Sequence, residues 1–315
     1  MTRLSGLDAV GRGCANLRAN RELLLAQFVA MVLLVGLVIL GLVPFVGLLG
    51  LELRDFAGLD QEQSAERLKA WIEKVPAMFS GERASSWLLA LAAFLVALTA
   101  ASILYSWFQA GTYGILAAGE RQAPPGPGRR FELYRTWSRA DFFGWANRWV
   151  WRYFWLYNLF GLLFLGTVAI FLLLLIVALV AAQQYGPAAA FGLGCGFSLP
   201  LLFVCFTLAL ACALAAAELA RSDGSVLRAA RRGYQLLGRR LGAAVLIYLL
   251  FLVAVLVVGA FDATSGLFVR FGLASFPVAQ LAVRFVLGLV QWLANTIVSL
   301  AFVGALVALV RSEAP

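Results

Sequence analysis

Histidine is absent from the 315-residue chain, and charged residues make up only 13% of it. Without histidine the chain lacks the commonest general base, the Ser-His and Cys-His nucleophile pairs, and the usual ligand of zinc, haem and copper. Lysine is almost absent too, with Lys69 and Lys74 alone, so arginine carries nearly all of the positive charge. We therefore expect no catalytic site, no metal and no other cofactor.

Cysteine is rare and shows no ligand spacing. Cys14 lies in the basic N-terminal region, and Cys195, Cys205 and Cys212 share one apolar segment without a C-x-x-C pair. Three thiols along one apolar segment are typical of small packing residues rather than of a metal or redox site.

Apolar residues dominate what is present, at 63% of the chain and a mean hydropathy of +0.90. These values predict a single all-α, polytopic integral membrane domain over residues 1–315. The apolar run after the basic N-terminus is longer than the core of a signal peptide, so we expect it to be retained as a span. The long apolar runs predict six transmembrane helices, at about 23–51, 86–116, 153–181, 189–217, 242–260 and 278–310, with an outer loop at 52–85.

Basic residues are distributed unequally between the two sides of these spans. Eighteen of the 25 fall in the N-terminal region, in 117–152, in 218–241 and in the tail. Because the cytoplasmic side retains arginine and lysine, both termini are predicted to be cytoplasmic. The predicted location is a bacterial inner (plasma) membrane.

The stretch 129–160 alternates arginines with aromatic residues before the third span. Tryptophan and tyrosine favour the headgroup level, and arginine reaches lipid phosphate from there. We interpret this stretch as an interfacial helix that continues into the span and either only anchors the protein or binds anionic headgroups. A long apolar span directly after it argues against nucleic acid. The candidate lipid-binding residues are Arg129, Arg130, Arg135, Trp137, Arg139, Trp145, Arg148, Trp149 and Arg152.

Two further basic segments, 4–21 and 218–241, are predicted to form amphipathic helices on the cytoplasmic face. In the first, the apolar side is expected to exclude Arg12 and Arg18 and to consist of Leu4, Leu7, Val10, Cys14 and Leu17. A displacement of 220 residues superimposes Ser5, Leu7, Ala9, Arg12, Gly13 and Leu17 on Ser225, Leu227, Ala229, Arg232, Gly233 and Leu237.

With 129–157 in the corresponding place before the third span, the plan is three helix-hairpin units. Each unit has an inner amphipathic helix, an outward span and a returning span. Such a repeat records either duplicated ancestry alone or a pseudo-symmetric site between the units.

The fourth span carries two features of interest. Gly192 and Gly196 have a G-x-x-x-G spacing that suits close helix packing. Glu218 lies at the cytoplasmic end of this span, where we expect it to pair with Arg221 or Arg228.

The sixth span carries a polar stripe, since Arg284, Gln291, Asn295 and Ser299 fall on one side of a helix. Polar groups at membrane depth face protein or a water-filled cavity. The stripe therefore either makes interhelical hydrogen bonds or lines the path of a polar substrate. In the outer loop, a helix predicted at 61–75 either lies flat on the outer leaflet or covers the outer ends of the spans as a lid.

Three modules of this kind, one of which reads ELARSDGSVLRAARRGYQLLGRRL before a span, resemble bacterial six-pass membrane proteins of unknown function. These are related in pattern to the membrane domain attached to some glycerophosphodiester phosphodiesterases. The resemblance implies an all-helical inner-membrane fold. It carries over no catalytic residue, because the histidines and metal-binding carboxylates of the phosphodiesterase barrel have no counterpart here.

These patterns support a non-enzymatic integral membrane protein. We expect an accessory or assembly factor that binds anionic lipid on the cytoplasmic side and a protein partner that the sequence does not identify. The alternative is a permease for a lipid-like or amphipathic solute, which requires a cavity along the polar stripe. The absence of a carboxylate at the centre of any span weighs against a proton-coupled carrier.

Overall fold

The computed structural model describes residues 4–49, 83–124, 130–272 and 276–313. Within these ranges the chain is helical and contains no strand, in agreement with the predicted all-α class. The helix predicted at 61–75, and its interpretation as a lid, lie outside the described residues. The predicted outer loop ends earlier than expected, because a helix already begins at Arg83.

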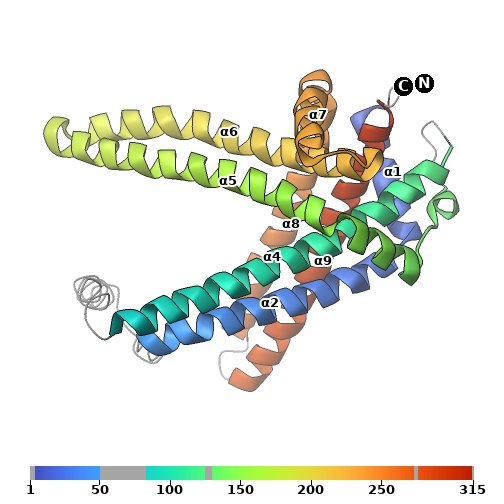
Figure 1. The fold of residues 1–315 in the computed structure, drawn as a ribbon. Helices are drawn as coiled ribbons and strands as arrows, with labels where there is room; N and C mark the ends of the chain where they lie inside the picture. Colours follow the sequence, from blue (N-terminus) through green and yellow to red (C-terminus); the bar gives the residue numbers. More distant parts are fainter. Residues whose placement is uncertain (1–3, 50–82, 125–129, 273–275, 314–315) are drawn as a thin grey trace. The chain divides into compact units, whose positions relative to one another are not determined.

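The chain divides into two compact units, which we describe separately. Unit 2, Phe28–Tyr105, contains most of α2 (Glu22–Leu49) and the first part of α4 (Arg83–Gln122). These two helices lie side by side, with Gly41 against Ala97 (Figure 1). Unit 1 comprises Met1–Gln27 and Ser106–Pro315.

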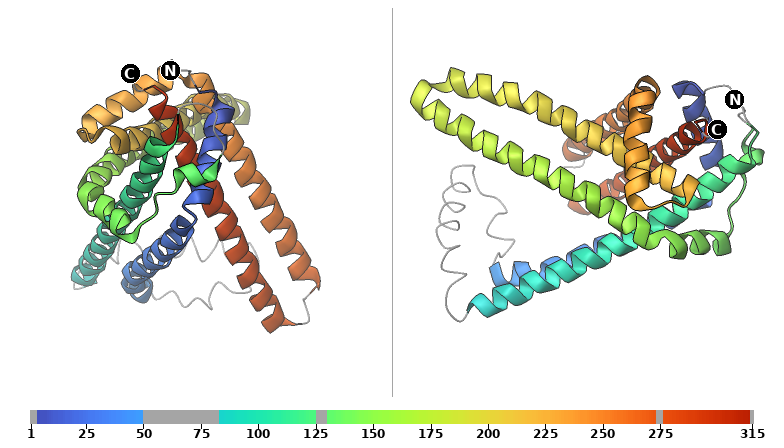
Figure 2. Two further views of the ribbon diagram at one scale, coloured as in Figure 1. Left: turned by 90° about the vertical axis from the view of Figure 1, so that its right-hand side faces the viewer. Right: turned by 45° about the horizontal axis from the view of Figure 1, so that its top comes forward.

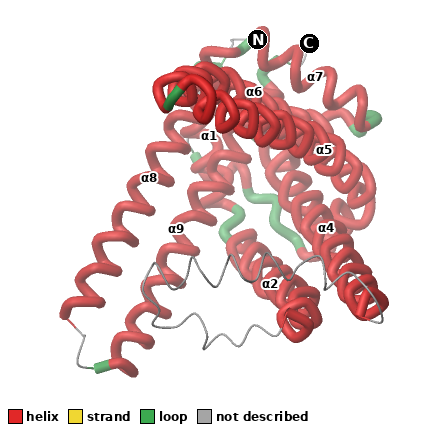
Figure 3. Tube along the Cα trace, turned by 90° about the vertical axis from the view of Figure 1, so that its left-hand side faces the viewer, coloured by secondary structure: helices red, strands yellow, loops and turns green. Residues whose placement is uncertain are grey.

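Unit 1 is built from two long antiparallel hairpins and two short helices. Helices α5 (Arg139–Tyr185) and α6 (Pro187–Ser222) form one hairpin, and α8 (Leu241–Gly272) and α9 (Pro277–Arg311) form the other (Figures 1 and 2). Helix α1 (Gly6–Ala19) packs along the C-terminal half of α9, and α7 (Val226–Arg239) packs on α6 (Figure 3). A short 3-10 helix, η2 (Phe131–Tyr134), precedes α5.

Six of these helices are long and apolar enough to cross a membrane. Their apolar segments are Glu22–Pro44, Ala84–Gln122, Arg139–Ala178, Gly196–Ser222, Leu241–Arg270 and Val278–Arg311. This finding agrees with the six long apolar helices that were predicted and with a multi-pass membrane protein.

Two boundaries differ from the prediction. The arginine–aromatic stretch continues into the span as one helix, as predicted, but this helix begins only at Arg139, and the part before it contains η2. No proline interrupts the chain from Arg139 to Tyr185, so the helix continues without a break. The fifth span was predicted to end near residue 260, but α8 continues to Gly272. There Thr264 and Ser265 donate their hydroxyl hydrogens to carbonyls one turn earlier, which keeps these polar residues within the helix.

The core of unit 1 gathers at one end of its helices, which we call the basic end. Its buried residues come from Ala9 in α1, from α7, and from 110–117, 149–160, 210–220, 244–247 and 305–310 in the long helices. Beyond this end the long helices expose leucine, valine and phenylalanine along most of their length. That distribution suits helices surrounded by lipid, where apolar side chains need not be buried in protein.

Helix α1 packs on α9, a contact that its prediction as an interfacial helix did not include. Of the predicted apolar side, Leu7 and Cys14 are exposed and Leu17 is buried. Arg12, which was expected away from that side, is buried together with Asn16, whereas Arg18 is exposed as expected. Gly13 allows this arrangement, because a Cβ there would lie 2.5 Å from the carbonyl oxygen of Ala301. Small residues let two helix backbones approach closely, and the polar side chains beside them then find partners across the contact.

The predicted glycine pair in α6 makes no such approach. A Cβ on Gly192 or Gly196 would meet no atom within 4 Å among the described residues. Close approaches to a neighbouring helix backbone occur instead at the basic end, among them at Gly13 in α1 and Gly233 in α7.

Candidate functional site at the basic end

A buried carboxylate organises the end of α6. The side chain of Glu218 is 1% exposed and accepts hydrogen bonds at both of its oxygens. Arg221 donates from Nε to Oε2 over 2.7 Å and from Nη2 to Oε1 over 2.8 Å, and Arg232 of α7 donates from Nη1 to Oε1 over 2.8 Å. We call these three residues the Glu218 cluster. A carboxylate buried this deeply persists as an ion only when it is paired, and here two guanidinium groups share it.

The predicted pairing of Glu218 with Arg221 is thus confirmed, but Arg228 is not its second partner. Arg232 takes that place because Gly233 rests on α6, where a Cβ would lie 2.7 Å from the carbonyl oxygen of Ala211. This close approach fixes α7 with Arg232 directed at the carboxylate.

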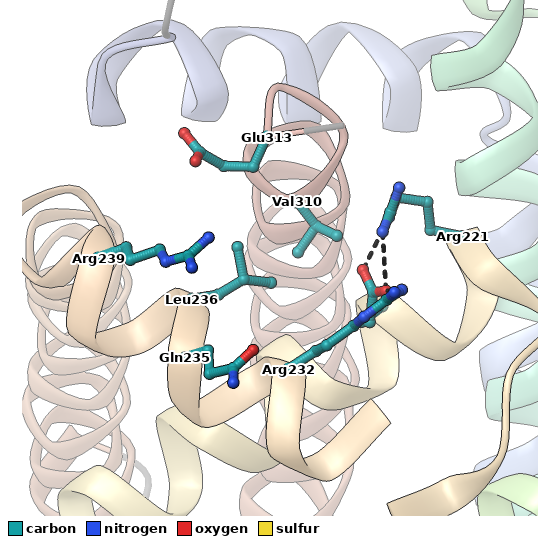
Figure 4. Close-up of a pocket in the computed structure, with 8 residues that line it drawn as sticks. Arg221, Arg232, Gln235, Leu236, Arg239, Val310 and Glu313 are labelled. Carbon is teal, nitrogen blue, oxygen red and sulfur yellow. Dashed lines mark hydrogen bonds and ion pairs between the residues drawn. The ribbon is translucent and has the colours of Figure 1, made fainter. Parts of the chain in front are cut away.

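A cavity of about 180 Å³ opens beside the Glu218 cluster. Figure 4 shows the guanidinium groups of Arg221, Arg232 and Arg239 around it, with Val310 and Leu236 between them. The lining residues are Glu218, Arg221, Arg232, Gln235, Leu236, Arg239, Val310 and Glu313.

The two carboxylates of this cavity are already matched by arginines. Glu313 lies 2.7 Å from the Nε of Arg240, and Glu218 has Arg221 and Arg232. Arg239 is exposed and forms no ion pair within the described part of the chain. The site therefore presents an excess of positive charge to whatever enters it, and guanidinium groups are suited to binding anions.

A second carboxylate, that of Asp223, pairs with two arginines from the first part of α5. Asp223 adopts a left-handed backbone conformation with φ of 50° at the end of α6. Its carboxylate accepts a hydrogen bond of 2.8 Å from the indole of Trp149 and pairs with Arg148 and Arg152. Desolvation acts to raise the pKa of Asp223, but the Trp149 hydrogen bond and the two arginines outweigh it and hold the pKa below its ordinary value.

Several of the predicted lipid-binding arginines therefore contact the protein's own carboxylates. Besides Arg148 and Arg152, Arg135 pairs with Glu22 over 2.6 Å and donates to the carbonyl oxygen of Ala19. Of the remaining arginines in that set, Arg130 and Arg139 are exposed, and Arg129 lies outside the described residues.

The three predicted tryptophans are more buried in the protein than a contact with lipid headgroups requires. Trp149 is 1% exposed, whereas Trp137 and Trp145 are half-buried. The exposed tryptophans of α5 are Trp151 and Trp155, at 59% and 62%. Their spacing of four residues places them on one side of the helix, as a headgroup contact requires.

The four residues of the polar stripe on α9 differ in how exposed they are. Arg284 and Ser299 are exposed, and Gln291 and Asn295 are half-buried. The Oδ1 atom of Asn295 is buried without a hydrogen-bond partner among the described residues. An apolar cavity of about 220 Å³ lies between α1, α8 and α9, but none of the four stripe residues lines it.

Sequence reasoning missed a second buried ion pair, between α1 and the end of α4. Arg12 and Glu120 are 3% and 1% exposed, and two guanidinium nitrogens of Arg12 donate to Glu120 Oε2 over 3.1 and 2.8 Å. Asn16 donates beside it to the carbonyl oxygen of Leu116 over 2.9 Å. The available signal was the position of Glu120, which follows small residues at the inner end of a returning span, as Glu218 does.

The described residues include no group of three or more histidine, cysteine, aspartate or glutamate side chains that could hold a metal ion. No protein-family model, no curated protein and no solved structure matches the chain.

Proposed function

We propose that the chain is a non-enzymatic multi-pass membrane protein, an accessory or assembly factor, whose basic end binds anionic lipid headgroups. The observation that carries this proposal is the outward face of α7. Leu227 and Tyr234 are 73% and 42% exposed there, and the exposed Arg231 lies between them at helical spacing. Apolar and aromatic residues beside arginine on one exposed helix face are typical of a helix at the headgroup level.

The distribution of arginine supports an orientation. Both α1 and the end of α9 belong to the basic end, and this end carries most of the 25 basic residues of the chain. By the positive-inside rule it faces the cytoplasm, with both termini on that side. The resemblance to bacterial six-pass proteins supports the plasma membrane of a bacterium. A protein partner recruited there is part of the proposal, without a residue set of its own.

The test uses exposed arginines that make no ion pair within the described residues. Arg139, Arg228 and Arg231 are replaced together by glutamine, and the matched control replaces the exposed Arg270 and Arg284, which lie far along α8 and α9 from the basic end. Each arginine near an anionic surface contributes about 1 kcal/mol, so retention of phosphatidylglycerol or cardiolipin should fall by roughly a hundredfold in the triple variant. The control should retain lipid as the unaltered protein does. Equal retention by all three proteins would contradict the proposal.

A permease for a lipid-like or amphipathic solute is the second candidate, favoured by Asn295. An amide oxygen buried without a hydrogen bond at membrane depth calls for water or a polar ligand. An Asn295→Cys variant tests this directly with a water-soluble maleimide. Labelling of the intact protein in vesicles would support a polar path along α9, and complete protection would remove the basis of this candidate.

A further inference from the structure

Two buried carboxylates of unit 1, Glu120 and Glu218, are paired with arginine in the same way. Arg12 and Arg232 correspond under the 220-residue displacement and pair with Glu120 and Glu218 at the ends of returning spans. The following residues, Gly13 and Gly233, each touch the backbone of a neighbouring helix. Ser5 and Ser225 stand at the N-terminal ends of the two helices, and the corresponding Leu7 and Leu227 are both exposed.

Arg12 and Glu120 form a closed cluster that is shielded from solvent, whereas the Glu218 cluster is open to solvent. Arg12 also donates to the carbonyl oxygen of Pro124 over 3.0 Å and lies over the ring of Tyr134, so that it is 3% exposed. In the Glu218 cluster, by contrast, Arg221 and Arg232 are 31% and 44% exposed. An ion pair that only joins two helices requires no such opening, as the closed cluster demonstrates.

Three of the positions that differ between the two helices line the cavity, namely Gln235, Leu236 and Arg239. Ala15 and Ala19 of α1 are buried, and the positions that correspond to them in α7 are Gln235 and Arg239. Two small packing residues are thus replaced by an amide and a guanidinium group, both exposed to the cavity. Their side chains contribute hydrogen-bond donors to the cavity and no ion pair to the helix contact within the described residues.

We propose that this cavity binds one phosphate ester group. Counting Arg240, four guanidinium groups face two carboxylates, an excess of two positive charges that matches a phosphate group. Glu218 holds Arg221 and Arg232 in fixed orientations, so less side-chain entropy is lost when an anion binds. The volume of about 180 Å³ exceeds what a single water needs, and Leu236 and Val310 supply an apolar wall for the carbon side of an ester.

This inference rests on the proposed function, because it assigns to one cavity a part of the anion binding at the basic end. The phosphate monoester has two possible sources, the headgroup of phosphatidic acid and a soluble metabolite. Both present a phosphate monoester to the arginines, and the lipid carries acyl chains in addition.

The experiment measures binding to the full-length protein in a neutral detergent. The probes are inorganic phosphate, glycerol 3-phosphate and phosphatidic acid. The test variant is Arg239→Gln, and the control is Arg270→Gln, which removes the same charge from an exposed position of α8 outside the cavity. Charge-assisted hydrogen bonds predict a loss of at least about tenfold in the affinity of Arg239→Gln for a phosphate ester. Arg270→Gln should stay within about twofold for all three probes at physiological salt.

A second variant guards against an effect of misfolding. The double change Gln235→Ala and Arg239→Ala gives α7 the residues of α1 at these positions, and it should abolish saturable binding without lowering the melting temperature. If soluble esters bind in an Arg239-dependent way, the source is a metabolite. If only phosphatidic acid does so, the source is a lipid headgroup.

Equal losses in Arg239→Gln and Arg270→Gln would contradict the proposed phosphate site but leave the proposed lipid attraction intact. Saturable binding that persists in the double variant would also contradict the proposed phosphate site. Full lipid retention by the triple arginine variant, with Arg239-dependent binding of soluble esters, would overturn the proposed function and leave the cavity as a metabolite site.

Discussion

Replacing Gly233 by alanine should weaken the docking of α7 on α6, and Gly238 in the same helix provides the control. A Cβ at position 233 would lie 2.7 Å from the carbonyl oxygen of Ala211 and 2.9 Å from both the Cβ and the amide nitrogen of Ala215. Non-bonded carbon contacts are optimal at about 3.5–4.0 Å, so α7 must move away by several tenths of an ångström. At Gly238 a Cβ would meet nothing within 4 Å.

The magnitude follows from two opposing contributions. Alanine gains about 1 kcal/mol over glycine in a helix interior, and this gain is common to both variants. Overpacking costs about 1–3 kcal/mol and applies to Gly233→Ala alone, so the two variants should differ by that amount. Arg232 moves with α7, and therefore Gly233→Ala should also weaken its pairing with Glu218.

The assay is unfolding in mixed micelles with an increasing mole fraction of SDS, followed by tryptophan fluorescence. Gly238→Ala should unfold at the same or a higher SDS fraction than the unaltered protein, and Gly233→Ala at a lower one. Indistinguishable midpoints for the two variants would show that α7 does not rest on α6 as described, and the origin of the Glu218 cluster would then need another explanation.

Two further predictions concern charges. Arg12→Ala leaves Glu120 buried without its main partner and should destabilise the protein by about 3–5 kcal/mol. The double variant Arg12→Met, Glu120→Leu should recover most of that loss in the same SDS assay. A double variant as unstable as the single one would refute this prediction. Asp223 has a lowered pKa in the folded protein, so its pairing contributes stability that is complete above its unfolded pKa of about 3.9 and is lost as the pH falls through the folded pKa. Asp223→Asn removes the ion pairs but keeps a residue that tolerates the left-handed conformation. This variant should be less stable than the unaltered protein at neutral pH, and the difference in stability should vanish in acid. A difference independent of pH would contradict the pairing.

The sequence predicted the spans because span length and apolar composition are local properties. The pairing of Glu218 with Arg221 was accessible for the same reason, since three residues separate them on one helix. The pairing of Arg12 with Glu120 was not, because 108 residues lie between the partners and nothing local relates them.

The contact of α1 with α9 was not predicted, for a similar physical reason. The prediction followed the large apolar residues and described α1 as an interfacial helix without a partner helix. Next to lipid, apolar side chains gain little from contact with protein, and small residues decide where backbones meet. The glycine at position 13 was therefore the better guide to the packed face, and Arg12 beside it found a carboxylate there.

The same reasoning accounts for the position of charge in this protein. Helices in lipid lack the hydrophobic drive that sets the register of helices in water, so close backbone contacts and directional polar bonds must set it instead. At the basic end, Gly13 and Gly233 supply the close contacts, and the adjacent Arg12 and Arg232 supply the directional bonds. A buried ion pair costs desolvation and adds little net stability, but it penalises every register in which the carboxylate stays unpaired. These two ion pairs therefore fix the register of α1 and α7, and only the Glu218 cluster leaves its arginines partly exposed.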